Sequence, residues 1–251
     1  MKEQILQNIK HKEIELEVFE TVTSTNDLLK QKAVNGAKGG TVVIAKTQTK
    51  GRGRRGKTFI SEKGGLYLSI LIRPKEFNFD TTLLTSAAAV AVSKAIEETS
   101  GIKTDIKWVN DVLINGKKVC GILCESGVCG NEYFVIVGIG INLFEPENGF
   151  EGSIKDIATC VFKQKDQEKA NKLTAKVIDN FFEIYNSGGF LNYYKDKNVV
   201  IGKDIFVLKN GEKITAKAIE IDDKCRLKVL YKDGKTEYLS SGEISIKLKQ
   251  I

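Results

Sequence analysis

The segment from Gly51 to Lys57 places three glycines and four cationic side chains in seven residues, directly after an apolar run. Glycines let backbone N–H groups approach an anion closely, and arginines present planar pairs of donors that match phosphate oxygens. The segment lies between the strand-like runs 41–45 and 65–72, and neither further charge nor low-complexity sequence follows it. We therefore interpret it as a phosphate-binding loop inside a folded domain and not as a solvated basic tail.

Four other short segments carry hydroxyl, amide or charged side chains at spacings that match one family. They are Ser24-Thr25-Asn26, Lys107-Trp108-Val109-Asn110-Asp111, Lys118 ahead of Gly121-Ile122-Leu123, and Gly138-Ile139-Gly140-Ile141-Asn142. With Gln48 and the basic loop, these segments resemble those of biotin protein ligases in composition, order and spacing, over about residues 20 to 145. The resemblance implies that biotin and ATP, with Mg²⁺, form biotinyl-5′-AMP and pyrophosphate. Biotin would then pass to one lysine of a carrier domain such as that of acetyl-CoA carboxylase.

The cationic residues suit the chemistry of such a reaction. Attack of a carboxylate on an α-phosphate brings two anions together and builds up charge in the transition state, so the site needs fixed cations. The candidates are Arg52, Arg54, Lys107 and Lys118. The resemblance implies that Lys118 bridges the biotin carboxylate and the α-phosphate, while the loop with Arg52 and Arg54 folds over the adenylate. A lone lysine beside a turn would usually be only solvated, but its place in the five-part pattern favours the catalytic role.

The hydroxyl and amide residues suit the ureido ring of biotin, which has two N–H donors and a carbonyl acceptor. Ser24 also fits as the N-cap of a helix over 26–34, whose N-terminus would add backbone donors. Trp108 is expected either to wall the apolar part of the biotin pocket or to lie in the core. The predicted biotin-binding set is Ser24, Thr25, Asn26, Gln48, Arg52, Gly53, Arg54, Trp108 and Lys118.

A second set of residues is expected to contact ATP and the adenylate. The resemblance assigns adenine to Asn142, although a glycine-spaced strand end is otherwise typical of packing against a neighbour. Asp111 keeps two interpretations: a Mg²⁺ or amine-positioning carboxylate, and an exposed turn residue. The predicted set is Gly51, Arg54, Arg55, Phe59, Lys107, Asn110 and Asn142.

The sequence departs from the family pattern at two positions. Val109 stands where proline is usual, and Phe59 stands where a tryptophan often follows the loop, so stacking on adenine would involve a smaller ring. Only about 20 residues precede Ser24, too few for a three-helix DNA-binding domain. We therefore expect a monofunctional ligase that does not bind DNA.

Three functions other than biotin ligation could use some of the same residues. A lipoate or octanoate ligase of the same fold class would make no use of the hydroxyl and amide cluster for its dithiolane or alkyl chain. A nucleic-acid-binding module would use Arg52 to Arg55, yet Phe59 is the only aromatic residue beside the loop. The run from Gly51 to Thr58 also meets the P-loop spacing, but an extended segment follows it instead of an apolar helix.

The elements that must position these residues divide into two units. We expect residues 1–200 to form an α+β catalytic domain, which the resemblance implies is class II synthetase-like, around a mostly antiparallel mixed sheet with helices. From about Gly202 short alternating strands predict a small SH3-like β domain over 201–251, with turns at Asn210-Gly211 and Asp233-Gly234. The predicted strands are 13–19, 41–45, 65–72, 105–109, 112–114, 119–125 and 133–143, and the predicted helices are 26–34, 82–100 and 167–185.

The composition narrows the class of protein. The chain has 251 residues and a net charge of +7 from 39 Lys and Arg against 32 Asp and Glu, a mixed surface that does not by itself indicate nucleic acid. Its five cysteines show no C-x-x-C spacing and it has one histidine, which disfavours a zinc site and suits a reducing cytoplasm. No signal core or membrane-length apolar run occurs. We expect a cytoplasmic protein without a membrane partner. The family resemblance leaves open a homodimer that forms through the edges of the sheets.

Overall fold

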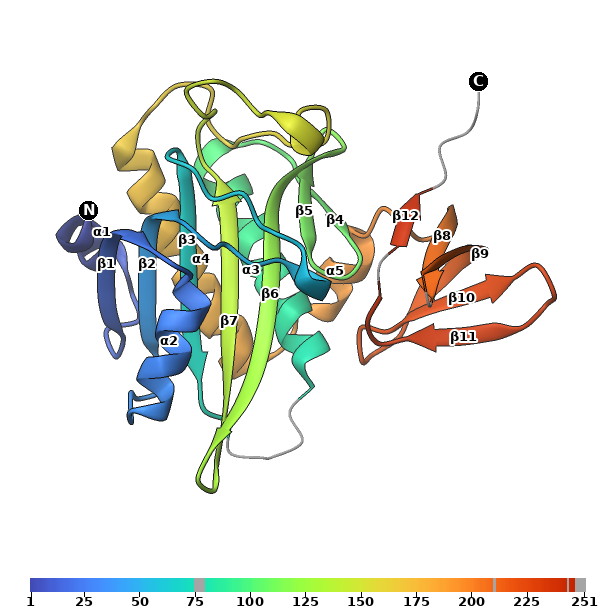
Figure 1. Cartoon of the computed structure of the whole chain (residues 1–251), viewed down its shortest axis with the longest axis horizontal. Coiled ribbons are helices and arrows are strands. Elements are labelled where there is room, and N and C mark those ends of the chain that lie inside the picture. Colours follow the sequence, from blue (N-terminus) through green and yellow to red (C-terminus); the bar gives the residue numbers. More distant parts are fainter. Residues whose placement is uncertain (75–79, 210, 243, 247–251) are drawn as a thin grey trace.

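The computed structural model describes residues 1–74, 80–209, 211–242 and 244–246 (Figure 1). Their strands form a seven-stranded sheet of order β1-β2-β3-β7-β6-β5-β4 and a five-stranded sheet of order β11-β10-β9-β8-β12. In the larger sheet β1 and β2 run parallel and the other neighbours run antiparallel. The expected α+β fold with a mostly antiparallel mixed sheet is confirmed.

The larger sheet is buried on both faces at its centre. Strand β3 is apolar over almost its whole length and nearly all of it is buried, as expected for a strand covered on both sides. Alternate residues of β2 enter separate apolar clusters, with Val42 and Ile44 in the larger one and Val43 in the smaller. The strands of this sheet are β1 (Glu15–Val22), β2 (Thr41–Gln48), β3 (Gly65–Ile72), β4 (Asp105–Lys107), β5 (Asp111–Ile114), β6 (Lys117–Cys129) and β7 (Glu132–Asn142).

Helices cover the two faces unequally (Figure 1). Helices α3 (Thr81–Ser100) and α4 (Gln167–Ser187) pack against each other behind the sheet, and α2 (Thr25–Val34) covers part of the opposite face. Helix α3 begins where Asp80 accepts the Thr82 N–H, and it ends at Gly101, whose φ of 71° suits glycine. The shorter helices are α1 (Lys2–Asn8) and α5 (Leu191–Asp196). Among the described helices, none has the length and apolar character that a membrane crossing needs.

Two local features differ from the sequence-based expectations. Helix α1 was not predicted from its charged sequence; it forms because Ile5 and Ile9 are buried in the main core on the side of α4. Trp108 and Val109, predicted to continue a strand, lie in a turn between β4 and β5. This turn directs both side chains inward, since each is only 3% exposed.

The smaller sheet is antiparallel and lies beside the β4 and β5 edge of the larger one (Figure 1). The Trp108 Nε1–H donates to the Cys225 carbonyl oxygen at 2.9 Å, and the Thr82 hydroxyl donates to the Ser240 carbonyl oxygen at 3.1 Å. In the predicted Asn210-Gly211 turn, Asn210 lies outside the described residues. The strands are β8 (Asp204–Lys209), β9 (Glu212–Ile221), β10 (Leu227–Tyr231), β11 (Thr236–Leu239) and β12 (Ile244–Ile246).

Trp108→Phe is expected to lower the free energy of unfolding by about 1–3 kcal/mol, because it leaves the Cys225 carbonyl oxygen without its indole donor in a buried junction. Chemical denaturation followed by circular dichroism would measure this change. Thr82→Val is the matched control, since its bond to Ser240 is exposed, and we expect it to change the free energy by under about 0.5 kcal/mol. Equal losses in both variants would contradict the prediction.

Candidate functional site

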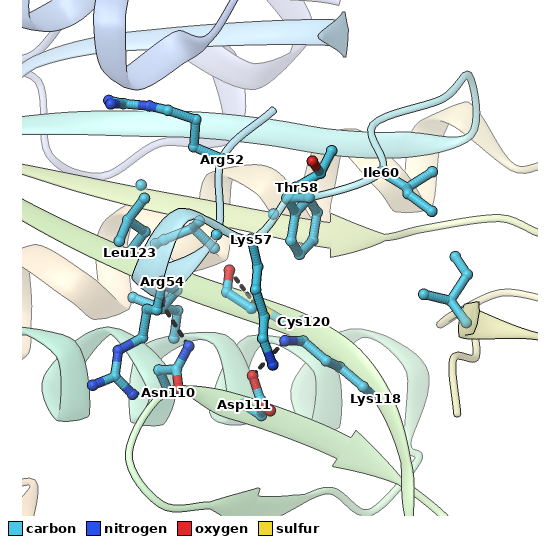
Figure 2. Close-up of a pocket in the computed structure, with 18 of the residues that line it drawn as sticks. Arg52, Arg54, Lys57, Thr58, Ile60, Asn110, Asp111, Lys118, Cys120 and Leu123 are labelled. Carbon is cyan, nitrogen blue, oxygen red and sulfur yellow. Dashed lines mark hydrogen bonds and ion pairs between the residues drawn. The ribbon is translucent and has the colours of Figure 1, made fainter. Parts of the chain in front are cut away.

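A cavity of about 740 Å³ opens beside the basic loop (Figure 2). Its wall includes the N-terminus of α2, the segment 52–60, the turn between β4 and β5, strands β6 and β7, the segment 153–158 and part of the smaller C-terminal unit. The structure thus brings together nearly all the residues singled out from the sequence; their individual roles remain predictions. Those that line the cavity are Ser24, Thr25, Asn26, Gln48, Arg52, Gly53, Arg54, Arg55, Phe59, Lys107, Trp108, Asn110, Asp111, Lys118 and Asn142.

Gly51 is the one predicted site residue that does not line the cavity. A Cβ atom at this position would collide with the Phe59 carbonyl oxygen and the Ser61 hydroxyl. The Gly51 carbonyl oxygen accepts the Phe59 N–H at 3.0 Å. Glycine is therefore required here for close passage of two backbone segments, which shapes the base of the loop.

The hydroxyl and amide residues at the start of α2 are tied to one another. Ser24 is the predicted N-cap, and its hydroxyl accepts the Asp27 N–H. Gln48 Oε1 accepts from both the N–H and the hydroxyl of Thr25, at 2.8 and 3.1 Å, while Gln48 Nε2 donates to the Ser61 hydroxyl at 2.9 Å. These bonds fix which end of the Gln48 amide faces each partner, so the cluster is organised before any ligand arrives.

Ser69 is a buried member of this cluster that the sequence analysis missed. Its hydroxyl lies 2.8 Å from Thr25 Oγ1 and 2.6 Å from Asn26 Oδ1. Opposite it on β7, Gly138 leaves the space that Asn26 fills, because a Cβ atom there would collide with Asn26 Oδ1. A single serine inside the largely apolar run of β3 was the only signal in the sequence.

The ring of Phe59 lies on a surface made by two glycines. Gly121 and Gly140 are paired on β6 and β7, and Cβ atoms on them would come within 2.9 and 2.5 Å of the ring. Tyr67 meets the ring edge-on with centroids 6.3 Å apart, and Lys118 Nζ lies 5.9 Å from its centroid. The glycines of β7 therefore leave room for side chains in the cavity, in addition to any close packing against a neighbouring strand.

Cationic side chains gather at the other end of the cavity. Lys118 Nζ lies 2.5 Å from Asp111 Oδ1, and Figure 2 shows the ends of Lys57 and Lys118 converging on Asp111. Arg54 Nη1 donates to Asn110 Oδ1 and to the Gly242 carbonyl oxygen, both at 3.2 Å. Burial lowers the pKa of Arg54, opposed by the charge of Asp111; a guanidinium stays protonated in proteins. Anions that enter here would meet fixed positive charge.

Neither thiols nor a metal cluster supply an obvious reactive centre in the described part of the chain. Burial raises the pKa of the Cys120 thiol in the cavity wall, and it raises that of Cys124 to about 12, which makes both poor nucleophiles at neutral pH. No group of three or more metal-ligating side chains occurs among the described residues. Of the described residues that line the cavity, Asp111 is the only carboxylate.

Two parts of the cavity wall could not be recognised from motifs. The segment 153–158 is held against β6 because the Lys118 N–H donates to the Ile157 carbonyl oxygen at 2.7 Å and the Thr159 N–H donates to the Lys118 carbonyl oxygen at 2.9 Å. Strand β12 of the smaller sheet adds Ile244, and the segment between β11 and β12 adds Gly242. Both lie far along the sequence from the basic loop, with no local pattern that links them to it.

Comparison with known proteins gives this architecture a family. Residues 18–142 match the biotin/lipoate A/B protein ligase family, and residues 200–247 match the biotin protein ligase C-terminal domain. A solved biotin protein ligase from Aquifex aeolicus, in complex with biotin and ATP, is 32% identical with a TM-score of 0.76, over 93% of this chain and 98% of that one. The chain belongs to the biotin protein ligase family.

Curated relatives of this biotin protein ligase family member match over different lengths. The bifunctional ligase/repressor BirA of Bacillus subtilis is 46% identical over 144 residues, which are 57% of this chain and 44% of that protein. The chain thus matches less than half of that relative. The biotin--[acetyl-CoA-carboxylase] ligase of Mycobacterium tuberculosis is 28% identical over 239 residues, 92% of this chain and 88% of that one.

Proposed function

We propose that this chain is an ATP-dependent biotin ligase that forms biotinyl-5′-AMP and transfers biotin to a lysine of a biotin carboxyl carrier domain. The observation that carries the proposal is the layout of one cavity. Its hydroxyl and amide cluster lies around Thr25 and Asn26, while Arg54, Lys107 and Lys118 line the same space. A ligand with a polar ring at one end and a carboxylate at the other, meeting a nucleotide phosphate, suits this layout.

In the first half-reaction the biotin carboxylate attacks the α-phosphorus of ATP, and the bond to pyrophosphate breaks. We assign to Lys118 the neutralisation of the two reacting anions, and ligand binding would draw it away from Asp111. Arg54 and Lys107 would stabilise charge on the phosphate oxygens. Phe59, next to Lys118, would offer a flat surface to the adenylate.

In the second half-reaction the amine of the carrier lysine attacks the biotinyl carbonyl carbon, AMP leaves and an amide forms. The amine must lose a proton to become a nucleophile. Asp111 lies in the wall beside Lys118. Among the described lining residues it is the one carboxylate, and so the candidate to accept this proton. The free cysteines are consistent with the reducing cytoplasm in which such a carrier would be met.

Mg²⁺ has only a limited fit to this cavity. Among the described lining residues Asp111 supplies the one carboxylate, and Lys118 pairs with it. Mg²⁺ is often held by one or two carboxylates together with substrate phosphates. We therefore assign the ion to ATP, and among the described lining residues Asp111 is the one carboxylate that could reach it.

A lipoate ligase is the second candidate because the matching family model covers both substrate classes. Three features favour biotin: the hydroxyl and amide cluster, the match to the biotin protein ligase C-terminal domain, and a biotin-bound relative in Aquifex aeolicus. Homodimer formation and the absence of DNA binding remain predictions from the sequence.

Isothermal titration calorimetry with biotin, lipoate and ATP separately, and then with biotin plus ATP, tests the proposal. We expect heat from biotin and none from lipoate, followed by pyrophosphate release when both substrates are present. Biotinylation of a purified carrier domain, detected by mass spectrometry, completes the test. Binding of lipoate in preference to biotin would mean that the chain is a lipoate ligase.

Trypsin should distinguish the free and ligand-bound basic loop, in which Arg52, Arg54, Arg55 and Lys57 are cleavage sites. Like charges repel and glycines are entropically costly to fix, so we expect rapid cleavage in the free protein. Cleavage should be somewhat slower with biotin and strongly suppressed with biotin plus ATP, because phosphate charge offsets both penalties. Equal cleavage rates in all three states would mean that the loop does not cover the adenylate.

A further inference from the structure

Arg52 is held between two carboxylates on one side of the cavity. Its Nη2 atom lies 2.7 Å from Asp27 Oδ1 on α2 and 2.7 Å from Glu125 Oε2 on β6. In Figure 2 the Arg52 side chain points away from Lys118 and Asp111, where the reacting phosphate is expected. We refer to Asp27, Arg52 and Glu125 as the arginine clasp.

Glu125 joins this clasp to the hydroxyl and amide cluster. The same Oε2 atom that meets Arg52 also accepts the Asn26 Nδ2–H at 2.7 Å. A carboxylate accepts only from the NH₂ end of an amide, so this bond, together with a longer one of 3.3 Å from Asn26 Nδ2 to the Leu123 carbonyl oxygen, fixes the orientation of Asn26. Asn26 Oδ1 then faces Ser69, from which it accepts at 2.6 Å, and retains acceptor capacity for a second donor.

We propose that Glu125 is a positioning residue that couples recognition of the biotin ring to the basic loop. It orients Asn26 so that the amide oxygen can accept from a ureido N–H, and it anchors Arg52 at the same end of the cavity. Asp27 serves only the second task. This inference rests on the proposed function, since it assigns the ring to the Asn26 end of the cavity.

The exposure of the clasp suits an anchor that can exchange its partners. The side chains of Arg52, Asp27 and Glu125 are 41%, 39% and 27% exposed, and ion pairs at such positions are weak. The bond from Asn26 is different because Asn26 is only 5% exposed. Loss of the charged acceptor would leave its buried NH₂ with only the longer bond to the Leu123 carbonyl oxygen, which is costly. Glu125 should therefore matter more for biotin affinity than for loop attachment, and Asp27 should matter only for the loop.

Three single substitutions separate these roles. Glu125→Ala removes both bonds, Glu125→Gln keeps an oxygen for both bonds but removes the charge, and Asp27→Asn weakens only the pair with Arg52. The dissociation constant for biotin is measured by calorimetry without ATP. Cleavage after Arg52 by trypsin is timed in the free protein, and melting by circular dichroism checks that each variant is folded.

Glu125→Ala is expected to weaken biotin binding by roughly ten-fold or more, whereas Glu125→Gln and Asp27→Asn stay within about three-fold of the wild type. All three variants should be cleaved faster after Arg52. If Glu125→Ala does not fold, Glu125→Gln carries the test. Near-normal biotin affinity together with faster cleavage after Arg52 in that variant supports the proposal, and failure to observe this combination overturns it.

Three outcomes would count against the inference. Wild-type affinity in folded Glu125→Ala would remove the role in ring recognition, and an equal loss in Asp27→Asn would mean that the charge around Arg52 controls binding. Unchanged cleavage in every variant would remove the anchor. A wild-type protein that binds no biotin would instead overturn the proposed function, a result that cannot be confused with normal biotin binding in a variant.

Discussion

Lys118→Ala is expected to slow adenylate formation by two orders of magnitude or more, while the fold is retained. Lys118 pairs with Asp111 in the cavity wall, and it would bridge two anions as they react. Loss of one such preorganised interaction costs about 3 kcal/mol or more in the transition state, and each 1.4 kcal/mol corresponds to about ten-fold in rate. Pyrophosphate release with biotin and ATP measures the effect.

Lys117→Ala is the matched control for this experiment. Lys117 is the preceding residue on β6, is exposed and does not line the cavity, so its removal changes the net charge equally without touching the site. We expect the control to release pyrophosphate at close to the wild-type rate. A Lys118→Ala protein as active as this control would exclude Lys118 from the first half-reaction.

Gly138→Ala and Gly140→Ala are expected to damage different ends of the cavity. A Cβ atom at 138 collides with Asn26 Oδ1, whereas one at 140 comes within 2.5 Å of the Phe59 ring. Because overpacking of this kind costs about 1–3 kcal/mol, Gly138→Ala should weaken biotin binding by roughly ten-fold or more. Gly140→Ala should instead raise the ATP concentration needed for half-maximal adenylate formation, with a smaller effect on biotin.

Each glycine variant serves as the control for the other, since both add one methyl group to the same strand, two residues apart. Biotin affinity by calorimetry and the ATP dependence of pyrophosphate release provide the two measurements. If both variants lose biotin and ATP binding in the same proportion, the two glycines serve the packing of β7 in general and the division of the cavity is wrong.

Much of the local structure was readable from neighbouring residues. The predicted helices 26–34, 82–100 and 167–185 correspond to α2, α3 and α4 within two residues at each end. Their caps are short-range chemistry: Ser24 and Asp80 accept backbone N–H groups and Gly101 takes a positive φ. Helix α1 escaped prediction because its stability comes from burial of Ile5 and Ile9 against distant residues, not from its own pattern.

The sequence by itself determined which segments carry chemistry and in what order, because glycine spacing, cation clustering and helix caps are properties of adjacent residues. Only the tertiary structure decided how those segments meet. Glu125 lies 73 residues from Arg52, and Gly242 lies 188 residues from Arg54, yet both pairs are in hydrogen-bond contact. Such contacts depend on strand register and on the docking of the smaller sheet, and a change of one residue in register would turn Glu125 to the opposite face of β6. A local pattern cannot encode that register, so the partners of Arg52, Arg54 and Asn26 became visible only in the folded chain.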